Sequence, residues 1–136
     1  MKYAMFGVLL AAAAGQPLSA HHSFAAEFDA NKPVSLTGTV TRLEWTNPHI
    51  WVYLDVKDDQ GVPQHWQCEG GAPNTLTRNG WGRESLKAND RITIDGALAK
   101  DGSKTCNARV VKLPDGRSVF AGSAGGDAPP PAKPQG

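Results

Sequence analysis

The chain of 136 residues lacks several features that mark common functional classes. It has 14 basic and 13 acidic side chains, so its formal net charge of +1 provides no general attraction for nucleic acid or anionic lipid. Beyond the first 20 residues, no apolar run approaches the length of a membrane span. The mature chain is therefore predicted to have neither a nucleic-acid partner nor a membrane span.

The first 20 residues have the pattern of a secretory signal peptide. Lys2 provides a positive start, an apolar stretch follows from Ala4 to Ala14, and small residues end it. Cleavage after Ala20 fits best, and cleavage after Ala14 or Ser19 is the alternative. No cysteine lies near the cut, which argues against a lipoprotein. We therefore expect a periplasmic or secreted protein.

Cysteine and methionine are scarce. Met1 and Met5 are the only methionines, and both are lost with the signal peptide, which disfavours a methionine-rich Cu(I) carrier. Cys68 and Cys106 are the only cysteines and have no CxxC spacing. In an oxidising compartment such a pair predicts a structural disulfide, with two separate buried thiols as the alternative.

The mature sequence consists mostly of short stretches in which apolar and polar residues alternate, a pattern typical of β-strands. Gly38 lies inside the first strand and suggests a bend or bulge. Pro73 suits the first turn of a short helix that ends before Gly80. The expected strands are residues 34–45, 50–56, 64–69, 90–103 and 105–113.

Three strands, a helix and two strands are the order of the OB-fold, a small five-stranded Greek-key barrel. We therefore predict a mainly β, OB-like barrel with one short helix between strands 3 and 4, with an open β-sandwich as the alternative. The domain organisation follows from this order. It comprises a signal peptide (1–20), an N-terminal segment (21–33), the barrel domain (34–120) and a flexible Gly- and Pro-rich tail (121–136).

Four stretches carry a resemblance to a known family: "HHSFAAEFD", "GTVTRLEWTNPHIWVYLDV", "EGGAPNTLTRNGW" and "NARVVKLPDGR". Together they resemble an uncharacterised family of small exported bacterial proteins, whose mature chains begin with His-His-Ser. The resemblance covers nearly all of residues 20–123. It implies maturation beside His21 and no particular activity. Cys68 and Cys106 are not part of the family pattern, so the resemblance implies that a disulfide would be an accessory of this member.

The histidines are the most specific candidates for metal ligands in this sequence. After cleavage at Ala20, the free amine and imidazole of His21 can chelate Cu(II), and His22 can complete a nitrogen-rich set. Cleavage after Ser19 also predicts Cu(II) binding, because a histidine then occupies the third position. His49 is the third candidate, since it lies in the Asn47-Pro48-His49 turn, and a rigid turn at a barrel rim could bring it near the chain terminus. The alternative is that solvent-exposed histidines at a chain end bind stray metal weakly.

Other side chains are weaker candidates for the same site. His65 lies in the middle of an expected strand. Glu27, Asp29 and Glu69 are possible oxygen ligands or acceptors for an imidazole proton. Phe24 and Phe28, at helical spacing, could dock the N-terminal segment on the domain and hold the terminus in one place. Ordinary core packing is the alternative, and it is favoured over a direct role in binding.

Aromatic residues suggest a second kind of site. OB-folds stack sugars or bases on aromatic side chains of one barrel face. Trp51 and Tyr53 alternate away from the aliphatic face of their strand, so they are predicted to form a ligand face. The alternative is that tryptophans close the core or its ends. The four tryptophans are Trp45, Trp51, Trp66 and Trp81.

The sequence has no recognisable catalytic constellation. Ser23 and His22 are adjacent only in sequence, which does not create the geometry of a nucleophile and its base. The stretch "EGGAPN" is interpreted as a turn and helix start rather than an anion site. Two functions therefore remain: an exported protein that binds Cu(II) or a similar divalent metal, or a periplasmic interaction module that docks a protein or glycan.

Overall fold

The computed structural model describes residues 24–122, so the predicted signal peptide, His21, His22 and the tail after Gly122 lie outside the described residues. This part of the chain is mainly β, with two helices of four and six residues. Neither described helix is long enough to cross a bilayer. The elements are α1 (Phe24–Glu27), β1 (Phe28–Glu44), β2 (Trp51–Lys57), β3 (Pro63–Glu69), α2 (Pro73–Arg78), β4 (Arg91–Ala99), β5 (Thr105–Lys112) and β6 (Ser118–Phe120).

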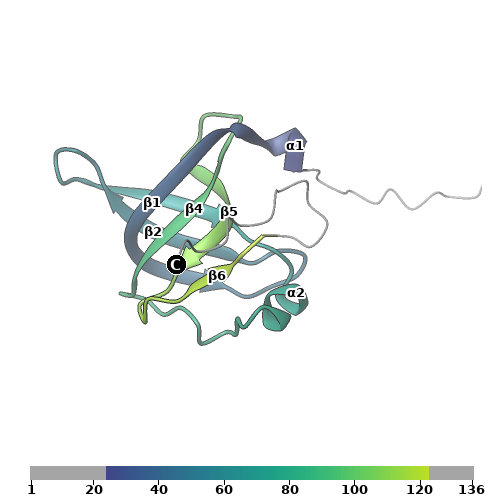
Figure 1. The fold of residues 1–136 in the computed structure, drawn as a ribbon. Helices are drawn as coiled ribbons and strands as arrows, with labels where there is room; N and C mark the ends of the chain where they lie inside the picture. The colour runs from purple at the N-terminus through teal and green to yellow at the C-terminus, as the bar shows by residue number, and fades with distance from the viewer. Residues whose placement is uncertain (1–23, 123–136) are drawn as a thin grey trace, which may run out of the picture.

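The strands form one six-stranded sheet in the order β3-β2-β1-β4-β5-β6, with antiparallel neighbours. In addition, β3 pairs in parallel with β5, where Cys68 is opposite Cys106. The hydrogen-bonded neighbours therefore run β1, β2, β3, β5, β4 and back to β1. Figure 1 shows these strands curving around a common interior, with α1 and α2 at opposite ends.

The alternation predicted for β2 is present. Ile50, Val52 and Leu54 are at most 1% exposed, whereas Trp51 and Tyr53 are half-buried on the other face. This period of two is what one buried face of a strand requires. The largest fully buried side chains are Ile50, Leu54, Leu76, Ile94, Val40, Val52 and Val111.

The segment that joins β3 to α2 is structural, as predicted. The backbone N–H groups of Gly70 and Gly71 donate to the carbonyl oxygens of Ile50 and Ala121, so they are not presented to an anion. Pro73 starts α2, because its missing N–H costs nothing in the first helical turn.

The bend predicted in β1 follows from close backbone contact. A Cβ atom at Gly38 would lie 2.3 Å from the Asp55 carbonyl oxygen of β2. The β1–β2 register then shifts between Val40 and Arg42. Only glycine allows the two backbones to approach this closely.

The strands differ from the prediction at β1, at β4 and in number. β4 ends at Ala99 rather than at residue 103, because the chain turns there and Asp101 accepts the Ser103 backbone N–H. β1 begins at Phe28 rather than Val34, because the buried Phe28 still pairs with Ala99 of β4 on the far side of a register shift. The described residues also contain a sixth strand, so the expected count of five was wrong. β6 has three residues, and Val119 supplies its buried contact while pairing with Val111 of β5.

Candidate functional site

A pocket of about 650 Å³ lies where α1, the edge of β2 and β3, and the β4–β5 connection meet. β2 and β3 supply Trp51, Gln67 and Glu69. Helix α1 supplies Glu27, and the β4–β5 connection and the start of β5 supply the other polar side chains. The polar lining residues besides Gln67 and Glu69 are Glu27, Lys100, Asp101, Ser103 and Thr105.

Trp51 forms the aromatic part of this pocket. It is half-buried, and its cross-strand neighbours are Glu44 on β1 and Glu69 on β3. Both neighbours are acidic. The ring therefore lies in a row of the sheet that has a carboxylate on each side.

Tyr53, the other residue of the predicted ligand face, lies in a different environment. The Arg42 guanidinium covers its ring at 4.1 Å from the centroid, and the Tyr53 hydroxyl donates to Glu44 at 3.1 Å. Arg42 also pairs with Glu44 at 2.8 Å. Burial, followed by the contact with Glu44, raises the pKa of Tyr53. The predicted ligand face is thus divided: Trp51 lines the pocket, and Tyr53 packs with its neighbours.

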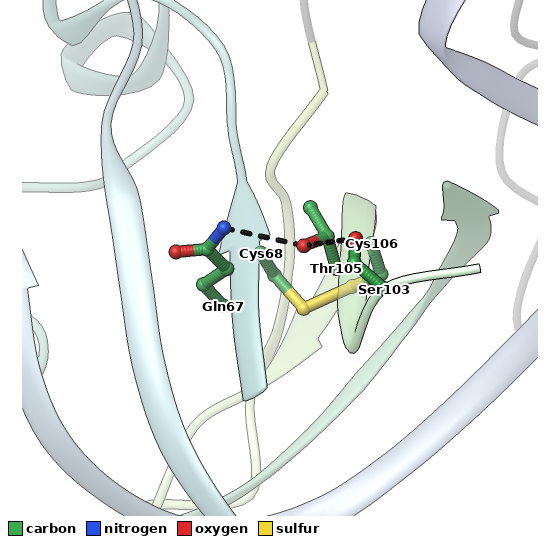
Figure 2. Close-up of a disulfide and its surroundings, with 5 residues drawn as sticks. All are labelled: Gln67, Cys68, Ser103, Thr105 and Cys106. Carbon is green, nitrogen blue, oxygen red and sulfur yellow. Dashed lines mark hydrogen bonds between the residues drawn. A yellow bond between two sulfur atoms is a disulfide. The ribbon is translucent and has the colours of Figure 1, made fainter. Parts of the chain in front are cut away.

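Hydrogen-bonding groups line the pocket beside β3 and β5. The Gln67 side-chain amide donates to the Thr105 hydroxyl at 3.2 Å, and the Ser103 and Thr105 hydroxyls are 2.9 Å apart, as Figure 2 shows. Ser103 also donates to Asp101 through its hydroxyl and its backbone N–H. The Ser103 hydroxyl is the main cause that lowers the pKa of the Asp101 carboxyl.

The predicted disulfide is confirmed and lies next to these polar groups. Cys68 and Cys106 are bonded with an S–S distance of 2.11 Å, and both are fully buried. Each cysteine directly follows a residue of the hydrogen-bonded pair, Gln67 or Thr105 (Figure 2). The disulfide therefore joins the two strands that supply this side of the pocket.

The N-terminal segment packs at the pocket's edge. The backbone N–H of Lys100 donates to the Glu27 carbonyl oxygen at 2.8 Å, and its ammonium donates to the Ala25 carbonyl oxygen. The Phe24 and Phe28 rings are 5.8 Å apart, and Phe28 is buried. Phe28 is thus packed in the interior, whereas Phe24 is half-buried against it. Glu27 lines the pocket, whereas Asp29 accepts a hydrogen bond from the Asn31 backbone.

His49 lies beside Glu69, a residue of the pocket. Its Nδ1 is 3.0 Å from the Gly70 carbonyl oxygen and 3.4 Å from Glu69 Oε1. A carbonyl oxygen can only accept, so Nδ1 carries the proton and Nε2 of the neutral ring keeps a lone pair. This is the tautomer of a histidine that can bind a metal through Nε2.

His65 shares no interaction partner with His49. Its Nδ1 lies 2.5 Å from Asp55 Oδ1, and its side chain is 87% exposed. Within residues 24–122, no three side chains of His, Cys, Asp or Glu are grouped so that they could hold a metal ion. The other two predicted ligands, His21 and His22, lie outside the described residues.

Three of the four tryptophans pack in or against the core, and one lines the pocket. Trp81 is 3% exposed, and its indole N–H donates to the Phe120 carbonyl oxygen at 3.1 Å. Trp45 and Trp66 pack against the core. Of the four, Trp51 is the one that lines the pocket.

Residues 9–108 match the family model described as "Family of unknown function (DUF6152)". The chain belongs to this family. The DUF6152 match includes His49, Trp51 and Glu69, and it confirms the resemblance to an uncharacterised family. A comparison with curated proteins found no match.

Four polar residues that line the pocket were not predicted from the sequence. Gln67, Asp101, Ser103 and Thr105 come from two segments that are distant along the chain. Asp101-Gly102-Ser103 has the composition of a turn, which was the available signal. Nothing in that pattern indicates that the turn lies beside Trp51, because the parallel β3–β5 pairing brings the segments together.

Proposed function

We propose that this protein is an exported binding protein whose ligand is a glycan held in the pocket beside Trp51. One observation carries the proposal: a half-buried tryptophan and a set of hydrogen-bonding side chains line the same pocket. An aromatic face stacks on the apolar face of a sugar ring, while amide, hydroxyl and carboxylate groups match its hydroxyls. The pocket volume of about 650 Å³ is within the range typical of small-ligand sites.

The order of strand pairing supports an OB-like Greek-key barrel. Its neighbours run β1, β2, β3, β5, β4 and back to β1, and α2 lies between β3 and β4 in the chain. OB-folds bind ligands on the face of strands 2 and 3 and with the loops that follow strands 1 and 4. The Trp51 pocket draws its lining from β2, β3 and the β4–β5 connection, which is the corresponding place.

Export is supported by two independent features. The first 20 residues have the pattern of a signal peptide, and Cys68 and Cys106 form a disulfide. Disulfides persist in oxidising compartments such as the periplasm and the cell exterior. A periplasmic or secreted location also suits a protein that binds glycans of the cell surface.

A glycan array probed with the mature protein, followed by calorimetry of the glycans that bind, tests the proposal. Stacking of a base on an aromatic side chain is worth about 1–3 kcal/mol, and with a similar value for a sugar ring Trp51→Ala should weaken binding by about five- to 160-fold. Tyr53→Ala is the matched control, because Tyr53 is the next outward aromatic on β2 and lies outside the pocket lining.

Two outcomes would contradict the glycan proposal. Equal losses in Trp51→Ala and Tyr53→Ala would remove the pocket as the binding site. Binding of an exported protein that depends on Trp51, with no glycan bound, would instead favour the docking of a protein partner on the same surface.

A second candidate function is Cu(II) binding by His21, His22 and His49. The specific observation that favours it is the hydrogen bond from His49 Nδ1 to the Gly70 carbonyl, which leaves Nε2 available as a ligand. In this proposal the amine and ring of His21 bind the ion, and His22 and His49 complete a nitrogen-rich set.

Intact mass measurement of the mature protein, before and during titration with Cu(II) and Zn(II), tests the metal site. We expect a chain that starts at His21 or Ala20 and takes up one Cu(II) selectively. His21→Ala and His49→Ala should lower the affinity far more than His65→Ala, because His65 is bound to Asp55 on the exposed surface. Equal effects of the three substitutions would exclude the site.

A further inference from the structure

The sheet has a second hollowed surface, at the opposite ends of β2 and β5 from the Trp51 pocket. One hollow, of about 340 Å³, is lined by Thr37, Arg91 and Lys57, among others. Another, of about 310 Å³, is lined by Thr37, Arg91 and Lys112. Because the two hollows share Thr37 and Arg91, they are adjacent parts of one surface, which we call the Thr37 groove. This groove has no lining residue in common with the Trp51 pocket.

The strand register brings the polar side chains of the Thr37 groove together. Thr39 of β1 is opposite Arg91 of β4. In the next outward row, Thr37 of β1 is opposite Thr93 of β4, which is opposite Lys112 of β5. Figure 1 shows β1, β4 and β5 side by side. Since side chains alternate between the two faces of a strand, these polar groups lie on the outward face, while the β4 positions between them are buried.

The Thr37 groove has an excess of positive charge. Lys57, Arg91 and Lys112 are exposed, and within residues 24–122 no carboxylate lies within ion-pair distance of them. Asp55 is the one acidic residue of the groove lining, and its Oδ1 lies 2.5 Å from His65 Nδ1. Three cations thus face one carboxylate that has its own partner.

Carboxylates near the ends of the groove are held in their own turns. Asp115 accepts hydrogen bonds from Arg117. Asp58 accepts backbone N–H groups of the β2–β3 hairpin, and Asp90 accepts the backbone N–H of Lys87. None of these carboxylates forms an ion pair with a cation of the groove, so the positive charge is available to a ligand.

Two threonines at the centre of the groove provide a hydrogen-bond donor. The Thr37 and Thr93 hydroxyl oxygens are 2.9 Å apart, so one O–H donates to the other oxygen. The second O–H then remains available to an acceptor outside the pair. Arg91 adds a planar fork of N–H groups that matches two oxygens of a phosphate or sulfate. This combination of donors recognises a tetrahedral oxyanion.

The length of the groove indicates more than one anionic group. From Lys57 on β2 to Lys112 on β5, the groove crosses β1 and β4, which is about 14 Å along the sheet at the usual strand spacing. A single phosphate or sulfate cannot contact both lysines and Arg91 over this distance. A chain that has several such groups can.

A polysaccharide fits the groove better than a lipid surface does. Proteins that lie on membranes combine cations with apolar side chains that enter the bilayer. In the described part of the chain, Val62 is the exposed large apolar residue, and it does not line the groove. The groove therefore lacks the apolar contacts of a membrane-binding surface.

We infer that the Thr37 groove binds an anionic polysaccharide through its sulfate or phosphate groups. Arg91 and the Thr37–Thr93 hydroxyl pair hold one group, and Lys57 and Lys112 contact its neighbours on either side. This second site is separate from the glycan site proposed at Trp51 and does not depend on it.

Calorimetry of the mature protein in low-salt buffer tests the inference with two probes. They are a sulfated dextran oligosaccharide and the uncharged dextran oligosaccharide of the same length. We expect the sulfated probe to bind equally well to the wild type and Trp51→Ala, because the two sites share no residue. Added salt should weaken this binding, since the groups involved are exposed charges. The uncharged probe should not bind in the groove.

Variants of one exposed residue separate the groove from the surface in general. Arg91→Gln should lower the affinity for the sulfated probe about tenfold or more, because hydrogen bonds to a charged group are lost. Arg91→Lys should have a smaller effect, since it keeps the charge and loses the fork. Arg78→Gln removes the same charge from an exposed site at the end of α2 and should change nothing. Thermal unfolding shows whether each variant is folded.

Four outcomes would overturn the inference. Equal losses in Arg91→Gln and Arg78→Gln would show attraction by the overall surface charge. Loss in Trp51→Ala but not in Arg91→Gln would place the sulfated probe in the Trp51 pocket and leave the proposed glycan function intact. Cosedimentation with phosphatidylglycerol vesicles that depends on Arg91, without binding of the sulfated probe, would identify a lipid headgroup as the ligand. Absence of any Arg91-dependent binding would exclude the groove as a site.

Discussion

Asp101 shows how one residue can shape both a turn and the pocket. It lies in the β4–β5 connection, where its Oδ1 accepts the Ser103 backbone N–H at 2.9 Å and the Ser103 hydroxyl at 2.6 Å. Both donors favour the ionised carboxyl, so the pKa of Asp101 is lowered from 3.8, chiefly by the Ser103 hydroxyl. The same hydroxyl is 2.9 Å from Thr105, so the turn also orders the polar lining of the pocket.

Ser103→Ala should therefore raise the pKa of Asp101 toward its ordinary value, because the main donor is lost and only the backbone N–H remains. The sign for stability follows from linkage. A carboxyl with a lowered folded-state pKa stabilises the fold above its ordinary pKa of 3.8, and this contribution disappears as the pH falls through the lower folded value. Titration of the aspartate carboxyl resonances by NMR measures the shift.

Asp115 provides the internal control in the same titration. Its pKa is also lowered, but mainly by the Arg117 side chain, at 2.7 Å. It should titrate identically in the wild type and Ser103→Ala. An unchanged Asp101 in the variant, or an equal shift at Asp115, would show that the Ser103 hydroxyl does not hold the Asp101 carboxyl in its ionised state.

At the scale of elements, glycines let strands approach closely where the sheet curves. A Cβ atom at Gly96 of β4 would lie 1.9 Å from the Asn107 carbonyl oxygen of β5, and the register of these strands shifts at the same point. Gly38 has the corresponding role between β1 and β2, with a distance of 2.3 Å to the Asp55 carbonyl oxygen. The long strand β1 can therefore bend enough to pair with β2 along one part and with β4 along another.

Elements with a strong local pattern could be predicted from the sequence. The alternation of β2 and the start of α2 at Pro73 correspond to the predictions, because each depends on neighbouring residues. The extension of β1 to Phe28 was missed, since Pro33 interrupts the strand pattern there and the pairing partner is β4. β6 was missed because three residues are too few to establish a period.

The candidate site also has a part that local sequence predicts and a part that it does not. Trp51 could be placed on the outward face of its strand by alternation alone. Whether an outward aromatic is open or covered depends on the side chain opposite it, and Arg42 covers Tyr53 whereas Glu44 is opposite Trp51. The register of β1 against β2 depends on contacts between distant segments. The sequence pattern therefore could not predict that Trp51 lines the pocket and that Arg42 covers Tyr53.

At the scale of the whole molecule, the β3–β5 pairing is the shortest link in the circuit of strands. It joins residues 67–69 to residues 105–107, and it is parallel, which is slightly less stable per residue than antiparallel pairing. The Cys68–Cys106 disulfide lies at its middle row, and both cysteines are fully buried. The covalent bond therefore reinforces the place where the hydrogen-bonded ladder is weakest.

Cys68→Ala combined with Cys106→Ala should lower the free energy of unfolding by up to about 4 kcal/mol. The bond closes a loop between residues 38 positions apart, and the chain-entropy model gives about this value for a loop of that size. Urea unfolding of the oxidised wild type and the double variant measures the difference. Val119→Ala is the control, because it removes buried apolar volume without removing a cross-link and should cost about 1–3 kcal/mol.

Because Gln67 and Thr105 precede the two cysteines and line the pocket, the double variant should also bind the glycan more weakly than Val119→Ala does. A double variant as stable as the wild type would show that the hydrogen bonds and core contacts of β3 and β5 are sufficient to close the circuit.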